Sequence, residues 1–281
     1  MLGNDFKAAM GGWLYPKAPL QWFWRSVGWF VILFLLFSVS QVIGGLLVYR
    51  YGFGGDAKLW LDQVSGQAGV DPAILADPEK GPMNAAFLKS SILGAFPTQL
   101  LTAIVALWLA HYGLPKRQGQ IPLHWPKIGG VGWVLLIVSF ILMMFVVMQV
   151  VISLSGAPPA SGLVETTLMG FAKDPFQFGL AMLGVVLGAP LAEELVFRGA
   201  LFAGIAQSRL GRVGAVIITS ALWAMAHAGP TPGLFVLVIF FMGLALGTLL
   251  LRFGSLWVTI ACHTAWNTVQ TLLILAIGTH T

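Results

Sequence analysis

The sequence predicts an all-α polytopic membrane protein with about seven transmembrane helices, within a range of six to eight. Of its 281 residues, 58% are hydrophobic and only 9% are charged, whereas a soluble domain usually carries about 25% charged residues. Most of the long apolar stretches are near the twenty or so residues with which a helix crosses a bilayer. Ten-residue segments of alternating hydrophobicity are absent, so the backbone is expected to satisfy its hydrogen bonds within helices.

Seven apolar segments account for the predicted spans: 26–49, 92–112, 129–153, 176–207, 213–228, 233–251 and 256–277. The first is longer than the 7–15-residue apolar core of a signal peptide, so it is expected to be retained. These segments divide the chain into an N-terminal segment 1–25, variable helices over 26–153, and a four-helix core over 176–277. The long loop at about 50–91 is interpreted as a connector, with a lid or a partner surface as the alternative.

The distribution of Lys and Arg predicts a cytoplasmic N-terminus. With that orientation, nine basic residues flank the cytoplasmic side: Lys7, Lys17, Arg25, Lys116, Arg117, Lys127, Arg209, Arg212 and Arg252. Only five lie on the other side: Arg50, Lys58, Lys80, Lys89 and Lys173. Cytoplasmic flanks carry an excess of basic residues, so the loop at 50–91 and, with seven spans, the C-terminus are non-cytoplasmic. The net charge of +5 comes from these flanks, and no clustered basic face indicates a nucleic-acid partner.

Three charged residues fall inside the segment 176–207: Glu193, Glu194 and Arg198. Insertion of Asp, Lys or Arg at the centre of a span costs roughly 2.5–3.5 kcal/mol, so charge there indicates a functional site. Glu194 and Arg198 are spaced i, i+4 and are expected to pair along one helix face. Glu193 points about 100° away from Glu194 and is left to face a cavity. Upstream, Pro190 removes one helical hydrogen bond and is expected to bend the helix.

Two further spans each carry a polar pair at i, i+4, Trp223 with His227 and His263 with Asn267. Each pair alone would be explained as inter-helical packing, for which polar side chains are common in membranes. Their depths agree, however. At a rise of about 1.5 Å per residue from the nearest cytoplasmic basic residue, Glu193 lies at about 24 Å, His227 and Asn267 at about 22 Å, and His263 at about 16 Å. This agreement predicts one convergent site.

The only cysteine, Cys262, excludes an internal disulfide. It precedes His263, which suggests a thiol nucleophile. Adjacent residues on a helix point about 100° apart, however, so a packing role is favoured for Cys262.

The polar residues form three motifs, one per span: Glu193-Glu194-x-x-x-Arg198, Trp223-x-x-x-His227 and His263-x-x-x-Asn267. In type and order they resemble the motifs of the CAAX prenyl protease type II and bacteriocin-processing family, also called the lysostaphin-resistance-protein-A-like or Abi family. The resemblance covers about 176–270, and residues 1–150 carry no motif. The family often has Phe where this chain has Trp223.

The resemblance implies an intramembrane endopeptidase that cleaves a membrane-embedded or lipidated protein, of a prenylated CAAX type or related to bacteriocins. Carried over to this chain, Glu193 would activate the attacking water and His227 would assist it. His263 and Asn267 would stabilise the oxyanion, an effect often worth several kcal/mol. Supporting roles fall to Glu194, Arg198 and Trp223.

Two questions stay open from the sequence. Glu193, His227 and His263 would supply the three ligands of a catalytic zinc, but Glu193 would then no longer serve as the base, so a scheme without a cofactor is favoured. The protein would alternatively be a non-catalytic immunity or scaffold protein of the same family. A proton-coupled transporter is disfavoured, because no inverted repeat is visible.

Overall fold

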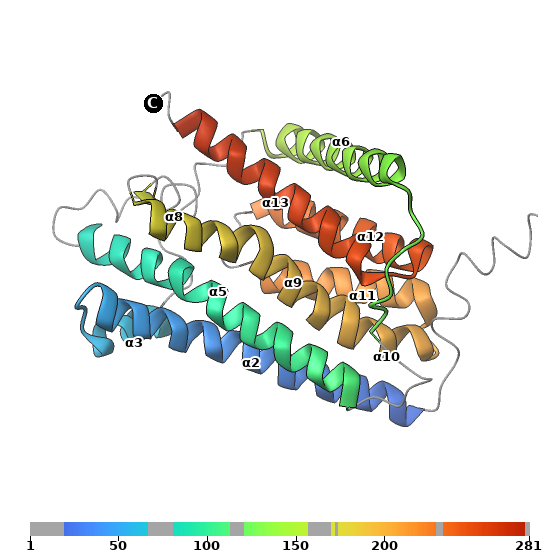
Figure 1. Cartoon of the computed structure of the whole chain (residues 1–281), viewed down its shortest axis with the longest axis horizontal. Helices are drawn as coiled ribbons and strands as arrows, with labels where there is room; N and C mark the ends of the chain where they lie inside the picture. The colour runs from blue at the N-terminus through green and yellow to red at the C-terminus, as the bar shows by residue number, and fades with distance from the viewer. Residues whose placement is uncertain are drawn as a thin grey trace, which may run out of the picture. The chain divides into compact units, whose positions relative to one another are not determined.

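A computed structural model describes residues 20–66, 81–112, 121–156, 170–171, 174–228 and 233–278 (Figure 1). Every regular element in these ranges is helical: α2 (Leu20–Gly52), α3 (Ala57–Gly66), α5 (Gly81–Tyr112), α6 (Gly130–Ser155), α8 (Pro175–Met182), η1 (Leu183–Gly188), α9 (Ala189–Glu193), η2 (Glu194–Leu201), α10 (Phe202–Gln207), α11 (Gly211–Ala226), η3 (Gly233–Phe235), α12 (Val236–Phe253) and α13 (Leu256–Gly278). The all-α prediction is confirmed. Most of the predicted N-terminal segment, residues 1–19, lies outside the described residues.

Each of the seven predicted spans coincides with a helix or a run of helices. Within the described residues, five are long and apolar enough to cross a membrane: Leu20–Gly52, Ala85–Leu109, Gly130–Ser155, Pro175–Gln207 and Gly233–Phe253. The other two helices, α11 and α13, are shorter or more polar than these five. The helix α11 has only 16 residues, and α13 has 23 residues but carries His263, Asn267 and Gln270 among its apolar ones. The chain is therefore a multi-pass membrane protein, and its orientation stays a prediction.

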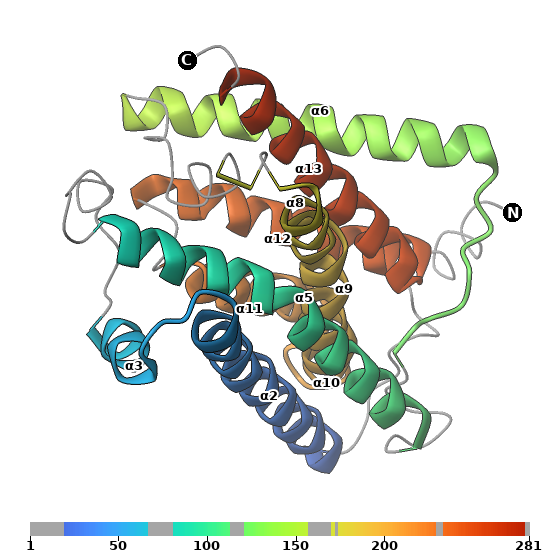
Figure 2. The same cartoon turned by 60° about the vertical axis from the view of Figure 1, so that its left-hand side comes forward.

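The loop expected at 50–91 contains helical structure that the sequence analysis missed. Asp56 begins α3, because its Oδ1 accepts hydrogen bonds from the backbone N–H groups of Lys58 (2.7 Å) and Leu59 (3.3 Å), which is a usual N-cap arrangement. Trp60 of α3 is buried against Phe87 of α5, with ring centroids 5.3 Å apart. The helix α3 therefore packs beside α2 and α5 (Figure 2).

Contacts divide the chain into two compact units, and each is described by itself. The first comprises residues 1–34, 103–158 and 193–266, and the second comprises 35–102, 159–192 and 267–281. In the second unit, α2 and α5 approach closely at two glycines: a Cβ added at Gly94 would lie 2.4 Å from the carbonyl carbon of Gly44. Small residues of this kind allow close packing of membrane helices.

In the first unit, α11 and α12 also pack backbone to backbone. A Cβ added at Gly243 of α12 would lie 2.7 Å from the Cβ of Ser220 of α11. The beginning of α13 is tied to the segment before α6: the Ser255 hydroxyl donates to the His124 carbonyl (2.7 Å), and the Trp257 indole donates to the Leu123 carbonyl (2.8 Å). These contacts hold the two helices that carry the predicted histidines.

Candidate active site

The helix that carries the two glutamates departs from α-helical geometry on both sides of them. It begins at Asp174, whose Oδ1 accepts from the N–H groups of Phe176 (3.0 Å) and Gln177 (3.1 Å). The π-helical segments η1 and η2 then flank α9. The segment η1 ends two residues before Pro190, which lacks the N–H that a regular helix would use. The bend expected at Pro190 stays a prediction. Single π turns inside α-helices are frequent at functional sites.

All eight residues of η2 are buried, including two charged ones. Glu194 and Arg198 form the ion pair that their spacing predicts, with 3.0 Å between Nη1 and Oε1 and no exposed side-chain surface on either residue. The same Oε1 accepts a hydrogen bond from Nδ1 of His263, at 3.1 Å. A buried charge without such partners would be costly, so Arg198 and His263 stabilise the Glu194 carboxylate. Among the described residues, Glu194 Oε2 and the Nε and Nη2 atoms of Arg198 have no hydrogen-bond partner.

Glu193 is the more accessible of the two glutamates. Its Oε2 accepts a 2.7 Å hydrogen bond from the Trp223 indole and lies 3.9 Å from Nε2 of His227. The Glu193 side chain is 11% exposed and that of His227 is 32% exposed, whereas Glu194 is fully buried. The adjacent glutamates therefore occupy different environments: one is enclosed in an ion pair, and the other is reachable beside a histidine.

The tautomer of His227 follows from its other contact. Its Nδ1 lies 2.8 Å from the backbone carbonyl oxygen of Trp223, and because a carbonyl only accepts, Nδ1 is the donor. In the neutral imidazole, Nε2 then carries a lone pair and faces the Glu193 carboxylate. Two acceptors 3.9 Å apart form a site for a proton donor that bonds to both.

Trp223 lies at the centre of this group and is only 2% exposed. The Arg198 guanidinium carbon is 4.4 Å from the centroid of its ring. The rings of His227 and His263 meet it edge to face, each with centroids 5.3 Å apart. The sequence predicts a supporting role for Trp223, and its hydrogen bond to Glu193 was not predicted. The available signal was the residue type, since Trp carries an N–H donor that Phe lacks.

Asn267 lies one turn beyond His263 on α13 and belongs to the second unit. There its side-chain amide donates to the carbonyl oxygen of Val185, at 2.9 Å. The structure thus gathers Glu193, His227 and His263 around Trp223, and a place for Asn267 in the same site stays a prediction. Cys262 is fully buried, as its expected packing role requires.

The zinc alternative requires Glu193, His227 and His263 to converge on one point. Among the described residues, no three His, Cys, Asp or Glu side chains lie close enough together to hold a metal ion. In addition, Nδ1 of His263 is engaged with Glu194. As arranged, the residues do not fit the zinc triad.

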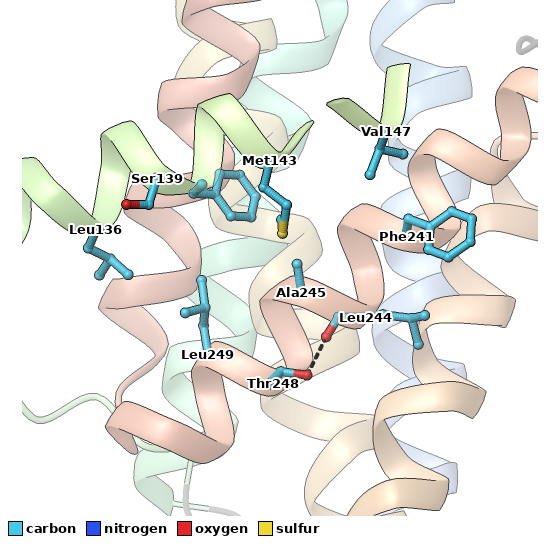
Figure 3. Close-up of a pocket in the computed structure, with 10 residues that line it drawn as sticks. Leu136, Ser139, Met143, Val147, Phe241, Leu244, Ala245, Thr248 and Leu249 are labelled. Carbon is cyan, nitrogen blue, oxygen red and sulfur yellow. Dashed lines mark hydrogen bonds between the residues drawn. The ribbon is translucent and has the colours of Figure 1, made fainter. Parts of the chain in front are cut away.

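A cavity of about 470 Å³ lies between α6 and α12. Figure 3 shows that its walls are mainly apolar side chains of these two helices, such as Met143 and Phe241, together with the hydroxyls of Ser139 and Thr248. The hydroxyl of Thr248 donates to the carbonyl of Leu244 in the preceding turn, at 2.7 Å. None of the predicted site residues lines this cavity.

The spans define a multi-pass membrane protein, and its described residues include a buried cluster of acidic residues and histidines. Residues 175–269, about a third of the chain, match the family model described as type II CAAX prenyl endopeptidase Rce1-like. This match confirms the resemblance, and the matched segment includes all three motifs. No curated protein and no solved structure matches the chain. A CAAX-type intramembrane protease is the activity that this family indicates.

Proposed function

We propose that the protein is an intramembrane endopeptidase that hydrolyses a peptide bond of a membrane-associated substrate, with water activated by Glu193. The observation that carries the proposal is that the two adjacent glutamates have different partners and different exposure. Glu194 is enclosed between Arg198 and His263 and is fully buried, whereas the Glu193 side chain keeps 11% of its surface exposed and lies 3.9 Å from His227. A general base must be reachable by its proton donor, and only Glu193 meets this condition.

In the proposed first step, a water donates one hydrogen bond to Glu193 and one to Nε2 of His227. Its oxygen then attacks the scissile carbonyl carbon while Glu193 accepts the proton. In the second step, Glu193 returns this proton to the leaving nitrogen, and the peptide bond breaks to give a carboxylic acid and an amine. These products then exchange a proton to become a carboxylate and an ammonium ion. A positioned acid–base group of this kind typically contributes roughly 10²- to 10⁴-fold in rate.

The oxyanion of the tetrahedral intermediate requires hydrogen-bond donors, and we assign these to His263 and Asn267. Because Nδ1 of His263 donates to Glu194, Nε2 carries a proton only in the imidazolium form. The proposed role of His263 as an oxyanion donor therefore depends on that form. Asn267 would donate from its side-chain amide. To reach the oxyanion, this amide would give up its hydrogen bond to the Val185 carbonyl.

We further propose that the reaction needs no metal. Glu193 then keeps its role as base, and both histidines keep the contacts that they make with protein groups. The substrate class follows from the family rather than from the geometry: a type II CAAX prenyl endopeptidase acts on prenylated chains. A lipidated protein is therefore the proposed partner, and the bilayer presents its anchor to the site.

The test is a comparison of membrane proteomes from host cells that carry either the wild-type chain or Glu193→Gln. The amide keeps the size of the side chain but no longer accepts a proton. We expect at least one membrane protein to persist uncleaved in the variant, while the variant itself accumulates to the wild-type level. Identical sets of C-termini from the two strains, with equal amounts of each chain, would instead indicate a scaffold.

A further inference from the structure

We propose that Trp223 is a positioning residue of the reaction, and that its indole N–H holds the carboxylate of Glu193 in the orientation for water activation. The inference rests on the proposed function, because it concerns the same base. It goes beyond that function by giving a role to a residue that differs from the Phe expected in the motif.

The hydrogen bond has the geometry of a strong interaction. The distance from Nε1 of Trp223 to Oε2 of Glu193 is 2.7 Å, which is at the short end of the range for N–H···O hydrogen bonds. A carboxylate has about four lone-pair positions. One bond from Trp223 therefore leaves positions free for the attacking water.

The indole is itself held from several sides. Arg198 covers its ring at 4.4 Å, and the edge-to-face contacts with His227 and His263 restrict rotation of the ring. The side chain of Glu193 has three rotatable bonds, so a rigid donor is an effective way to select one orientation. Supporting hydrogen bonds of this kind commonly hold a catalytic group in place.

A purely structural role is the alternative, since a buried Trp N–H usually finds an acceptor of some kind. The two roles predict different effects of Trp223→Phe. Loss of a structural hydrogen bond lowers stability and leaves the turnover of the folded protein unchanged. Loss of a positioning bond lowers kcat, because a misplaced catalytic group can cost about a hundredfold in rate, and it leaves substrate binding unchanged.

The chain offers a matched control in Trp29. Its buried Nε1 has no hydrogen-bond partner in the described part of the structure, so Trp29→Phe removes an indole N–H that bonds to nothing there. Both variants lose one indole nitrogen and the same ring area. Only the Trp223 variant loses a bond to the proposed base.

The experiment measures kcat and KM for purified wild type, Trp223→Phe and Trp29→Phe. Membranes from Glu193→Gln cells supply uncleaved substrate, and new C-termini are counted by mass spectrometry. We expect Trp223→Phe to lower kcat roughly 10- to 100-fold with KM within about twofold, and Trp29→Phe to match wild type. Because Trp223→Phe removes ring area as well, a second variant carries benzothienylalanine at position 223, in which sulfur replaces the N–H within the same ring shape.

Unchanged kcat in both Trp223 replacements would overturn the positioning role while leaving the proposed function intact. A wild-type protein that releases no new C-termini would contradict the proposed function itself. If Trp223→Phe fails to fold, the test uses the benzothienylalanine protein by itself. A lower kcat of this protein at the wild-type Tm supports the inference, and a wild-type kcat contradicts it.

Discussion

At the scale of single residues, adjacent glutamates differ because a helix turns each of them toward different neighbours. Glu194 meets Arg198 and His263, while Glu193 meets Trp223 and His227. One sequence motif thus provides both a paired charge inside the helix packing and a second carboxylate, 11% exposed, that faces a histidine. The proposed chemistry depends on this difference, since a carboxylate that is held by a guanidinium is a poor proton acceptor.

The buried pair is predicted to matter for folding. Glu194→Gln or Arg198→Ala leaves a charge buried without its partner, which is typically worth about 3–5 kcal/mol. Thermal melting in detergent should therefore show a clearly lower Tm and a lower folded yield for both variants. Arg209→Ala is the control, because Arg209 is exposed at the end of the same helical run. A wild-type Tm for Arg198→Ala, with activity lost, would contradict the structural role.

The residue scale also shows where sequence reasoning was sufficient. The spacing of Glu194 and Arg198 and the common depth of Glu193 and His227 follow from helical geometry, so both could be predicted. The bond from Trp223 to Glu193 joins residues thirty positions apart, and its formation depends on side-chain rotamers that no spacing rule provides. The hydrogen bond between His263 and Glu194 was also not predicted, because it too depends on side-chain rotamers.

At the scale of elements, close approach of α11 and α12 fixes the helix whose end carries His227. Gly243→Ala would place a Cβ 2.7 Å from the Cβ of Ser220, which forces the helices apart. We expect a loss of stability of roughly 1–3 kcal/mol from such overpacking, measured as a lower Tm.

The matched control for this prediction is Gly28→Ala in α2, where an added Cβ meets nothing within 4 Å. Alanine is the better helix former by roughly 0.5–1 kcal/mol, so its Tm should equal or exceed that of wild type. Equal melting temperatures for Gly243→Ala and wild type would show that the α11–α12 contact is looser than described.

The ends of a helix could be predicted from the sequence where an apolar run gives way sharply to polar residues. The segment predicted at 129–153 is α6 (Gly130–Ser155), and the one predicted at 256–277 is α13 (Leu256–Gly278). The helix α3 was missed because its ten residues are too few and too polar for a span, although Asp56 supplies a capping signal. The π segments around Pro190 were missed because periodicity arguments assume 3.6 residues per turn throughout.

At the scale of the whole molecule, the family match is confined to residues 175–269. The helices before it carry no motif, and their sequence indicates only that they cross the membrane. The predicted orientation rests on basic residues at the ends of the spans, which are a property of the whole chain rather than of any single contact. It therefore stays a prediction of the sequence alone.

The central claim is that Glu193 activates water without a metal, and it is tested most directly by cleavage in H₂¹⁸O. Purified, reconstituted wild-type chain and Glu193→Gln are each incubated with membranes from Glu193→Gln cells, with and without a zinc chelator. We expect the wild type to release new C-termini carrying ¹⁸O at the same rate in both conditions, and Glu193→Gln to release none at an unchanged Tm. Activity that chelation abolishes and added zinc restores, together with stoichiometric bound zinc, would contradict the claim.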